Sequence, residues 1–176
     1  IKAQGLIGVD IFSGDKIKIV NTEGGQVCEV TVFDNLGKNN QSIIGTKGDG
    51  NAEFTKYLLA NSKDKKNLLD KLKKKKIDFK KAKSSNFFNE NTLENENLKL
   101  TIQENGLIIF ATPGEDMQVD LQNTPTDIEI IIERNNKNKN KLESFLPDPL
   151  ANTSEEFLIN NSSAICQGIS NTHTCL

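Results

Sequence analysis

The sequence predicts a mainly β protein, an antiparallel β-barrel or sandwich with a lysine-rich helical insertion. Several segments alternate polar and apolar residues and are rich in Val, Ile and Thr, which favours strands. Turns with Gly, Asn and Asp separate these segments. In the middle of the chain the hydrophobic period changes to that of a helix. A hydrophobic content of 35% over 176 residues is enough for one core, so we expect one packed domain.

The first third of the chain has the pattern of consecutive β-hairpins. Residues 8–12 form a short apolar segment, residues 13–15 have turn chemistry, and residues 16–20 alternate polar and apolar side chains. A second turn at residues 22–25 leads into residues 26–33, which alternate again and carry β-branched Val and Thr. We expect the last two strands to pair antiparallel.

The middle of the chain is expected to hold the helices. Residues 35–51 have the composition of a loop, with one short β segment at Ile43–Ile44. Apolar residues then recur at helical spacing, which predicts two amphipathic helices in an insertion at about 52–83, with a break near Asn61. Residues 84–97 have few apolar side chains and no clear period, so we expect a loop there.

Strand patterns return in the last part of the domain. Residues 98–102 and 107–111 flank a Glu-Asn-Gly turn at 104–106, which is typical of a second hairpin. Residues 117–121 alternate, and residues 127–133 form an apolar strand pattern with both faces partly covered. At least six strands are therefore predicted.

The polar composition of the C-terminal part predicts a domain boundary. We assign residues 1–145 to the β-rich domain, and residues 146–176 to a linker and polar tail that leads to a possible further domain. Prolines make residues 146–150 a stiff connector, and residues 153–156 form a possible capping box for a short helix through Leu158.

Charge and cysteine content bound the class of protein. The chain has 22 basic and 24 acidic residues. Its net charge of −2 therefore gives no overall electrostatic attraction to nucleic acid or to acidic membranes. No stretch approaches the roughly 18 apolar residues of a membrane span. Cys28, Cys166 and Cys175 are odd in number and widely spaced, which fits a reducing compartment. We expect a soluble, cytoplasmic protein without membrane contact.

Histidine and lysine chemistry gives no catalytic assignment. The one histidine, His173, lies in the tail, so a Ser or Cys triad is excluded from the β unit, whereas carboxylate or lysine chemistry is not. Cys166, His173 and Cys175 are too few and too loosely spaced for structural zinc, and we assign no metal ligand. Eleven lysines in residues 63–83 form either a solvated helix face or a patch for phosphate-rich partners. Aromatic residues do not interleave with them, and we do not expect nucleic acid.

Acidic and amide residues around the second turn are the candidate ligand-binding residues. They flank Gly24-Gly25, where a glycine turn would let backbone amides approach a small polar ligand. A charged residue in a β-branched strand more often simply faces water. The candidates are Asp15, Glu23, Gln26 and Glu29.

Residues 14–33 carry a family resemblance. The segment begins with Gly-Asp and continues with alternating basic and apolar residues. It then has a turn ending in Gly-x-Gln, an acidic residue and an apolar strand. This order resembles the opening of the urea carboxylase-associated domain family, whose function is uncharacterised. Residues 119–121 and 127–130 look like its closing strands. The family's central His-Asp-Thr segment and later Cys are missing, which implies that any metal-dependent activity has been lost.

The resemblance also implies a setting for the domain. Similar domains look to be fused ahead of folate-dependent aminomethyltransferases like the glycine-cleavage T-protein. It thus implies a non-catalytic accessory or small-molecule-binding domain in amine and one-carbon metabolism. Its partner would be an adjoining catalytic domain, in the same chain or a partner subunit, and tetrahydrofolate would bind there and not in this segment. The alternatives are a stand-alone metal-binding enzyme of the urea carboxylase-associated type and a lysine-patch module.

Overall fold

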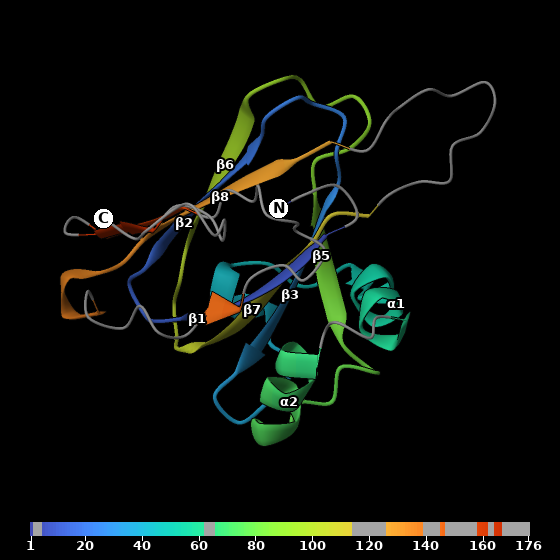
Figure 1. Ribbon diagram of the computed structural model, residues 1–176, viewed down its shortest axis with the longest axis vertical. Helices are drawn as coiled ribbons and strands as arrows, with labels where there is room; N and C mark the ends of the chain where they lie inside the picture. Colours follow the sequence, from blue (N-terminus) through green and yellow to red (C-terminus); the bar gives the residue numbers. More distant parts are fainter. Residues whose placement is uncertain are drawn as a thin grey trace.

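A computed structural model gives the fold of the chain (Figure 1). It describes residues 1, 5–61, 66–113, 126–138, 145–146, 158–161 and 164–166.

Two β-sheets make up most of the molecule. The strands run antiparallel to their neighbours except β10, which is parallel to β8. No barrel closes among the described strands, so the fold is sandwich-like, and the predicted mainly β class is confirmed. The first sheet has the order β4 (Gly50–Asn51), β5 (Lys83–Phe87), β3 (Cys28–Asp34), β7 (Gly106–Ala111), β1 (Leu6–Ile11) and β9 (Phe145–Leu146). The second has the order β11 (Ala164–Cys166), β10 (Leu158–Asn161), β8 (Ile128–Glu133), β2 (Lys16–Asn21) and β6 (Glu96–Thr101).

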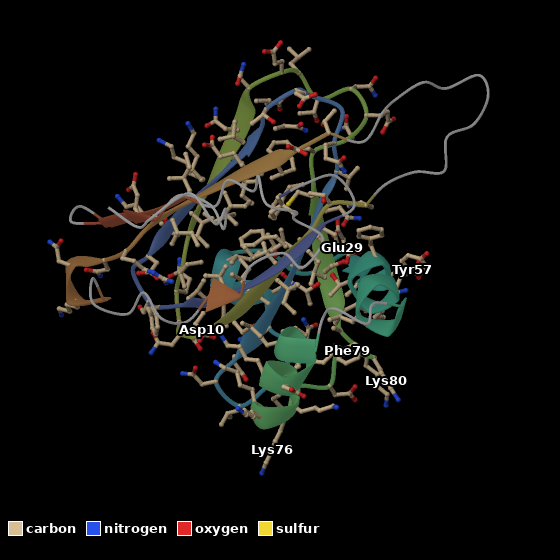
Figure 2. The ribbon with its side chains drawn as sticks, in the orientation of Figure 1. Asp10, Glu29, Tyr57, Lys76, Phe79 and Lys80 are labelled. Carbon is tan, nitrogen blue, oxygen red and sulfur yellow. The ribbon has the colours of Figure 1, made fainter. Side chains whose placement is uncertain are left out.

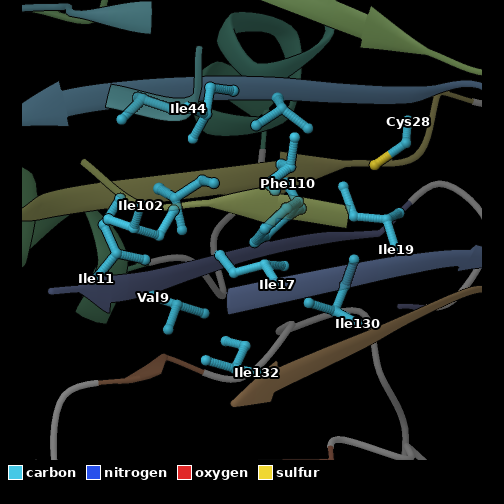
Figure 3. Close-up of a cluster of buried hydrophobic side chains, with 14 of the residues drawn as sticks. Val9, Ile11, Ile17, Ile19, Cys28, Ile44, Ile102, Phe110, Ile130 and Ile132 are labelled. Carbon is cyan, nitrogen blue, oxygen red and sulfur yellow. The ribbon is translucent and has the colours of Figure 1, made fainter. Parts of the chain in front are cut away.

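The main hydrophobic core lies between the two sheets (Figure 3). Successive side chains of a strand point to opposite faces, so alternate residues of strands such as β1, β2, β3 and β8 enter this core. In β2 these are Ile17 and Ile19, the apolar positions of the predicted alternation. In β8 they are Ile128, Ile130 and Ile132, whereas Ile131 is only partly buried, although the sequence pattern predicted that both faces of this strand would be partly covered. Branched aliphatic side chains dominate the cluster, which includes Val9, Ile11, Ile17, Ile19, Val30, Val32, Ile108, Phe110, Ile128, Ile130 and Ile132.

Two helices cover the other face of the first sheet (Figure 1). They are α1 (Glu53–Asn61) and α2 (Lys66–Lys74), which confirms the two predicted helices. Their apolar side chains, such as Leu59 and Leu72, pack in a second cluster with Leu107 and Ile109 of β7. The first sheet is therefore covered on both faces, which explains why all of β7 is buried.

The predicted hairpin pairings are wrong. β2 pairs with β6 and β8, whereas β3 pairs with β5 and β7, so the two strands expected to pair lie in different sheets. β1 and β2, also expected to form a hairpin, lie in different sheets as well. The strands of the second predicted hairpin, β6 and β7, likewise lie in different sheets. The alternating pattern marks the buried face of each strand but does not select the neighbouring strand.

Local assignments differ at three further places. Ile43 and Ile44 belong to the 3-10 helix η1 (Gln41–Ile44) and not to a strand. The predicted loop at 84–97 contains most of β5. Leu158, expected to end a helix, begins β10. A further 3-10 helix, η3 (Asn136–Asn138), follows β8.

Some sequence predictions concern residues that lie largely outside the described part of the chain. The strand expected at 117–121, most of the connector at 146–150 and the capping box at 153–156 lie outside the described residues. Within the described residues, no helix is long and apolar enough to span a membrane.

Candidate functional site

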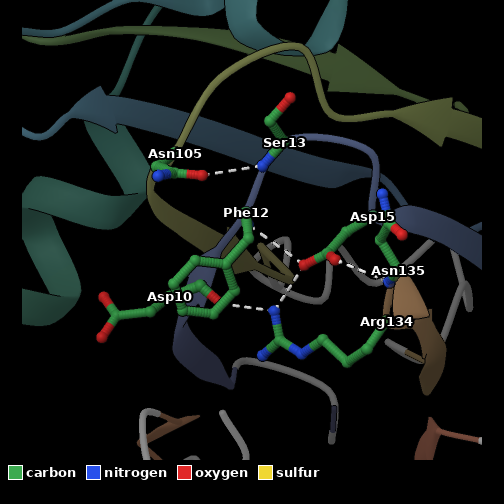
Figure 4. A network of polar contacts seen from close by, with 7 residues as sticks. All are labelled: Asp10, Phe12, Ser13, Asp15, Asn105, Arg134 and Asn135. Atoms are coloured by element: carbon green, nitrogen blue, oxygen red, sulfur yellow. Dashed lines mark hydrogen bonds and ion pairs between the residues drawn. The ribbon is translucent and has the colours of Figure 1, made fainter. Parts of the chain in front are cut away.

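Asp15 occupies the turn between β1 and β2, and its side chain is fully buried (Figure 4). Its Oδ2 accepts hydrogen bonds from the Phe12 backbone N–H at 3.0 Å and from Arg134 Nη1 at 2.6 Å. Its Oδ1 accepts the Asn135 backbone N–H at 3.0 Å. Both carboxylate oxygens are thus used within the protein.

Arg134 extends this contact from one sheet to the other. It follows β8 of the second sheet, and its Nη1 also donates to the Asp10 carbonyl oxygen on β1 of the first sheet at 2.8 Å. The guanidinium carbon lies 5.1 Å from the centre of the Phe12 ring, within cation–π range. Because the ion pair is buried, loss of either partner would leave an uncompensated charge in the interior.

Gln26 joins three separate segments of the chain. Its Nε2 donates to the Val27 carbonyl oxygen at 2.9 Å and to the Pro113 carbonyl oxygen at 2.8 Å. Its Oε1 accepts the Thr126 backbone N–H at 3.0 Å. The side chain is buried, so its polar atoms act as internal connections.

The Gly24-Gly25 turn packs against the loop between β5 and β6. The Gly25 N–H donates to the Thr92 carbonyl oxygen at 2.9 Å. A Cβ on Gly24, whose φ is +83°, would lie 2.7 Å from that same oxygen. The glycines therefore permit a close approach of two loops, while the neighbouring Glu23 is exposed.

Glu29 lies in β3, is 5% exposed, and receives the N-terminus of α1 (Figure 2). Its Oε1 accepts the Thr55 N–H at 2.8 Å and the Thr55 hydroxyl at 2.5 Å. Its Oε2 accepts the Phe54 N–H at 3.2 Å. Ala52, which precedes the helix, has no side-chain acceptor, so the strand supplies the cap. A carboxylate at this end also interacts favourably with the helix dipole.

The four candidate ligand-binding residues do not form one cluster. Asp15 precedes β2 and Gln26 follows it, and a strand of six residues spans roughly 20 Å. Glu29 faces α1 on the helix-covered side of the first sheet. Three of the four side chains are engaged in internal hydrogen bonds, and Glu23 alone is exposed. Ligand binding by these residues stays a prediction.

The sequence patterns do not reveal two structural anchors, Asp10 and Arg134. Asp10 accepts ion pairs from Lys71 and Lys75 of the helical insertion, each at 2.9 Å, and thereby fixes α2 to the first sheet. Arg134 anchors Asp15. The residue type could have pointed to Arg134, since it is an arginine and every other basic residue of the chain is Lys. Lys76 and Lys80, by contrast, project away from the sheets (Figure 2).

Cysteine and metal chemistry find no support in the described part. Burial raises the pKa of the Cys28 thiol to about 12, so Cys28 is protonated and unreactive near neutral pH. No group of three or more His, Cys, Asp or Glu that could hold a metal ion occurs among the described residues. His173 and Cys175 lie outside them.

The fold and these contacts define a β-sandwich unit held together by buried polar anchors. No protein-family model matches the chain, and no solved structure matches it. It is similar to the trimethylamine-oxide aldolase of Ruegeria pomeroyi, with 28% identity over 165 residues. The match covers 93% of this chain but 21% of that protein, so the chain spans about a fifth of the length of its curated relative. By its name, the relative acts on an amine oxide, which agrees with an amine-metabolism setting in general terms.

Proposed function

We propose that this chain is a non-catalytic accessory or small-molecule-binding module of an amine-processing protein. The observation that carries the proposal is the match of nearly the whole chain to about a fifth of a trimethylamine-oxide aldolase. The internal use of the Asp15 and Glu29 carboxylates supports a structural role for these groups in place of acid–base catalysis. If a small ligand binds at the second turn, the exposed Glu23 is the residue available to contact it.

The finer form of the proposal concerns the partner. We infer an adjoining catalytic domain, in the same chain or a partner subunit, of the folate-dependent aminomethyltransferase type. Tetrahydrofolate would bind to that domain, and the whole protein would work in the cytoplasm. The resemblance of residues 14–33 to the urea carboxylase-associated family supports this form.

Turnover by the purified chain tests the non-catalytic role. Loss of the trimethylamine-oxide methyl signal is followed by proton NMR, with and without tetrahydrofolate, and the Ruegeria protein is the positive control. We expect turnover by the control and none by the chain alone. Turnover by the chain alone would contradict the proposal and favour a stand-alone enzyme.

A chimera tests whether the chain is equivalent to the matched region. The chain replaces the matched fifth of the Ruegeria protein, and trimethylamine-oxide turnover is measured on the purified chimera. The proposal predicts measurable turnover. A chimera that is folded, by circular dichroism and gel filtration, yet inactive would count against equivalence. A chimera carrying Glu23→Gln then tests the one exposed candidate residue.

A further inference from the structure

Arg134 has unused hydrogen-bonding capacity in a buried position. Its side chain is fully buried, and its Nε and Nη2 have no hydrogen-bond partner among the described residues. Figure 4 shows these two nitrogens on the side of the guanidinium that faces away from Asp15. An arginine stays charged in proteins, so these donors cannot be removed by deprotonation. Leaving them unpaired carries a free-energy cost that calls for a partner.

Asp15 cannot accept hydrogen bonds from Arg134 Nε and Nη2 because both of its carboxylate oxygens already accept other hydrogen bonds. Oδ2 binds the Phe12 N–H and Arg134 Nη1, and Oδ1 binds the Asn135 N–H. The ion pair is therefore end-on and uses one guanidinium nitrogen. The second acceptor on that nitrogen is the Asp10 carbonyl oxygen. The Nε/Nη2 edge of the guanidinium therefore has no hydrogen-bond acceptor among the described residues.

We propose that the Nε/Nη2 edge of Arg134 is a binding position for a carboxylate group. This edge presents two parallel N–H donors, the geometry that matches the two oxygens of a carboxylate. Asp15 already neutralises Arg134, so a singly charged carboxylate suits the position better than a doubly charged phosphate. Because the edge is shielded from solvent, the group is small, either a free carboxylate of acetate size or one Asp or Glu side chain. The proposal is argued from Arg134 alone and does not rest on the proposed function.

The sequence makes the test unusually direct. Arg134 is the only arginine in the chain, so a nitrogen-15-labelled sample has one Nε–Hε signal. Sodium acetate is titrated against sodium chloride at equal ionic strength. For a free carboxylate we expect a saturable shift of this signal with acetate and none with chloride.

A second NMR measurement identifies a carboxylate supplied by the protein itself. If acetate causes no shift, the coupling across the hydrogen bond from Nε to its acceptor carbon is measured on carbon-13-labelled protein. A coupling to a side-chain carboxylate carbon supports the proposal. A coupling to a backbone carbonyl carbon, or no coupling with rapid exchange of Hε with water, overturns it.

Thermal unfolding gives an independent readout for the free-carboxylate case. Arg134→Lys keeps the charge opposite Asp15 but removes the two-donor edge. Acetate is expected to raise the Tm of the wild type by a few degrees relative to chloride, and not that of Arg134→Lys. Lys137→Gln, which changes an exposed cation three residues away, is the matched control and should respond like the wild type. Where the NMR titration shows binding, an equal acetate response in Arg134→Lys would exclude Arg134 as the site.

Discussion

Buried carboxylates in this chain bind backbone amides as much as side chains. Asp15 accepts the Phe12 and Asn135 N–H groups in addition to Arg134. Glu29 accepts two N–H groups at the start of α1. Hydrogen bonds to a charged acceptor are stronger than those between neutral groups. At the scale of single residues, these two acids therefore fix the positions of a turn and a helix.

Glu29→Gln is expected to destabilise the fold by about 1–2 kcal/mol, because α1 loses a charged cap at its N-terminus. The free energy of unfolding is measured by urea titration. Glu53→Gln is the matched control, since Glu53 is exposed in the first turn of α1, and its cost should stay below about 1 kcal/mol. Equal losses in the two variants would show that Glu29 does not cap α1.

At the scale of elements, the connections between strands carry the chain from one sheet to the other. The turn at residues 22–25 links β2 of the second sheet to β3 of the first. It is held by the 88–95 loop, through the Gly25 N–H and the Thr92 carbonyl oxygen. The glycines of this turn are therefore explained by contact between two loops of the same chain.

Gly24→Ala is expected to cost more stability than Gly45→Ala. Both glycines have left-handed φ values, +83° and +76°, so both variants carry a strain of about 1–2 kcal/mol. Gly24 alone would also place its Cβ 2.7 Å from the Thr92 carbonyl oxygen, whereas Gly45 has no atom within 4 Å. The Tm of each variant is measured by circular dichroism. Equal shifts in Tm would mean that the loop contact contributes nothing.

At the scale of the whole molecule, the positions of several strands follow from the sequence but their pairing does not. Alternation of polar and apolar residues locates β2 and β3 to within about two residues, because a half-buried strand needs that pattern. Segments that are more continuously apolar locate β7 and β8 as closely. β5 was missed since Ser84, Ser85 and Asn86 are polar, and the strand owes its place to its ladder with β3.

The role of Asp15 could not be predicted for a similar reason. Its turn chemistry and charge are visible in the sequence, and they suggested ligand binding. Its partner Arg134 is 119 residues away, and no local pattern connects the two. Residue type thus identified an important acid, while its structural use depends on the packing of the two sheets.

The most direct test of this account compares the free energies of unfolding of Asp15→Asn and Glu23→Gln. Asp15→Asn leaves Arg134 buried without its counter-charge, so we predict a loss of about 3–5 kcal/mol. Glu23→Gln changes an exposed side chain, so we predict a change within about 0.5 kcal/mol. An Asp15→Asn variant as stable as Glu23→Gln would contradict the claim that buried polar anchors hold the two sheets together.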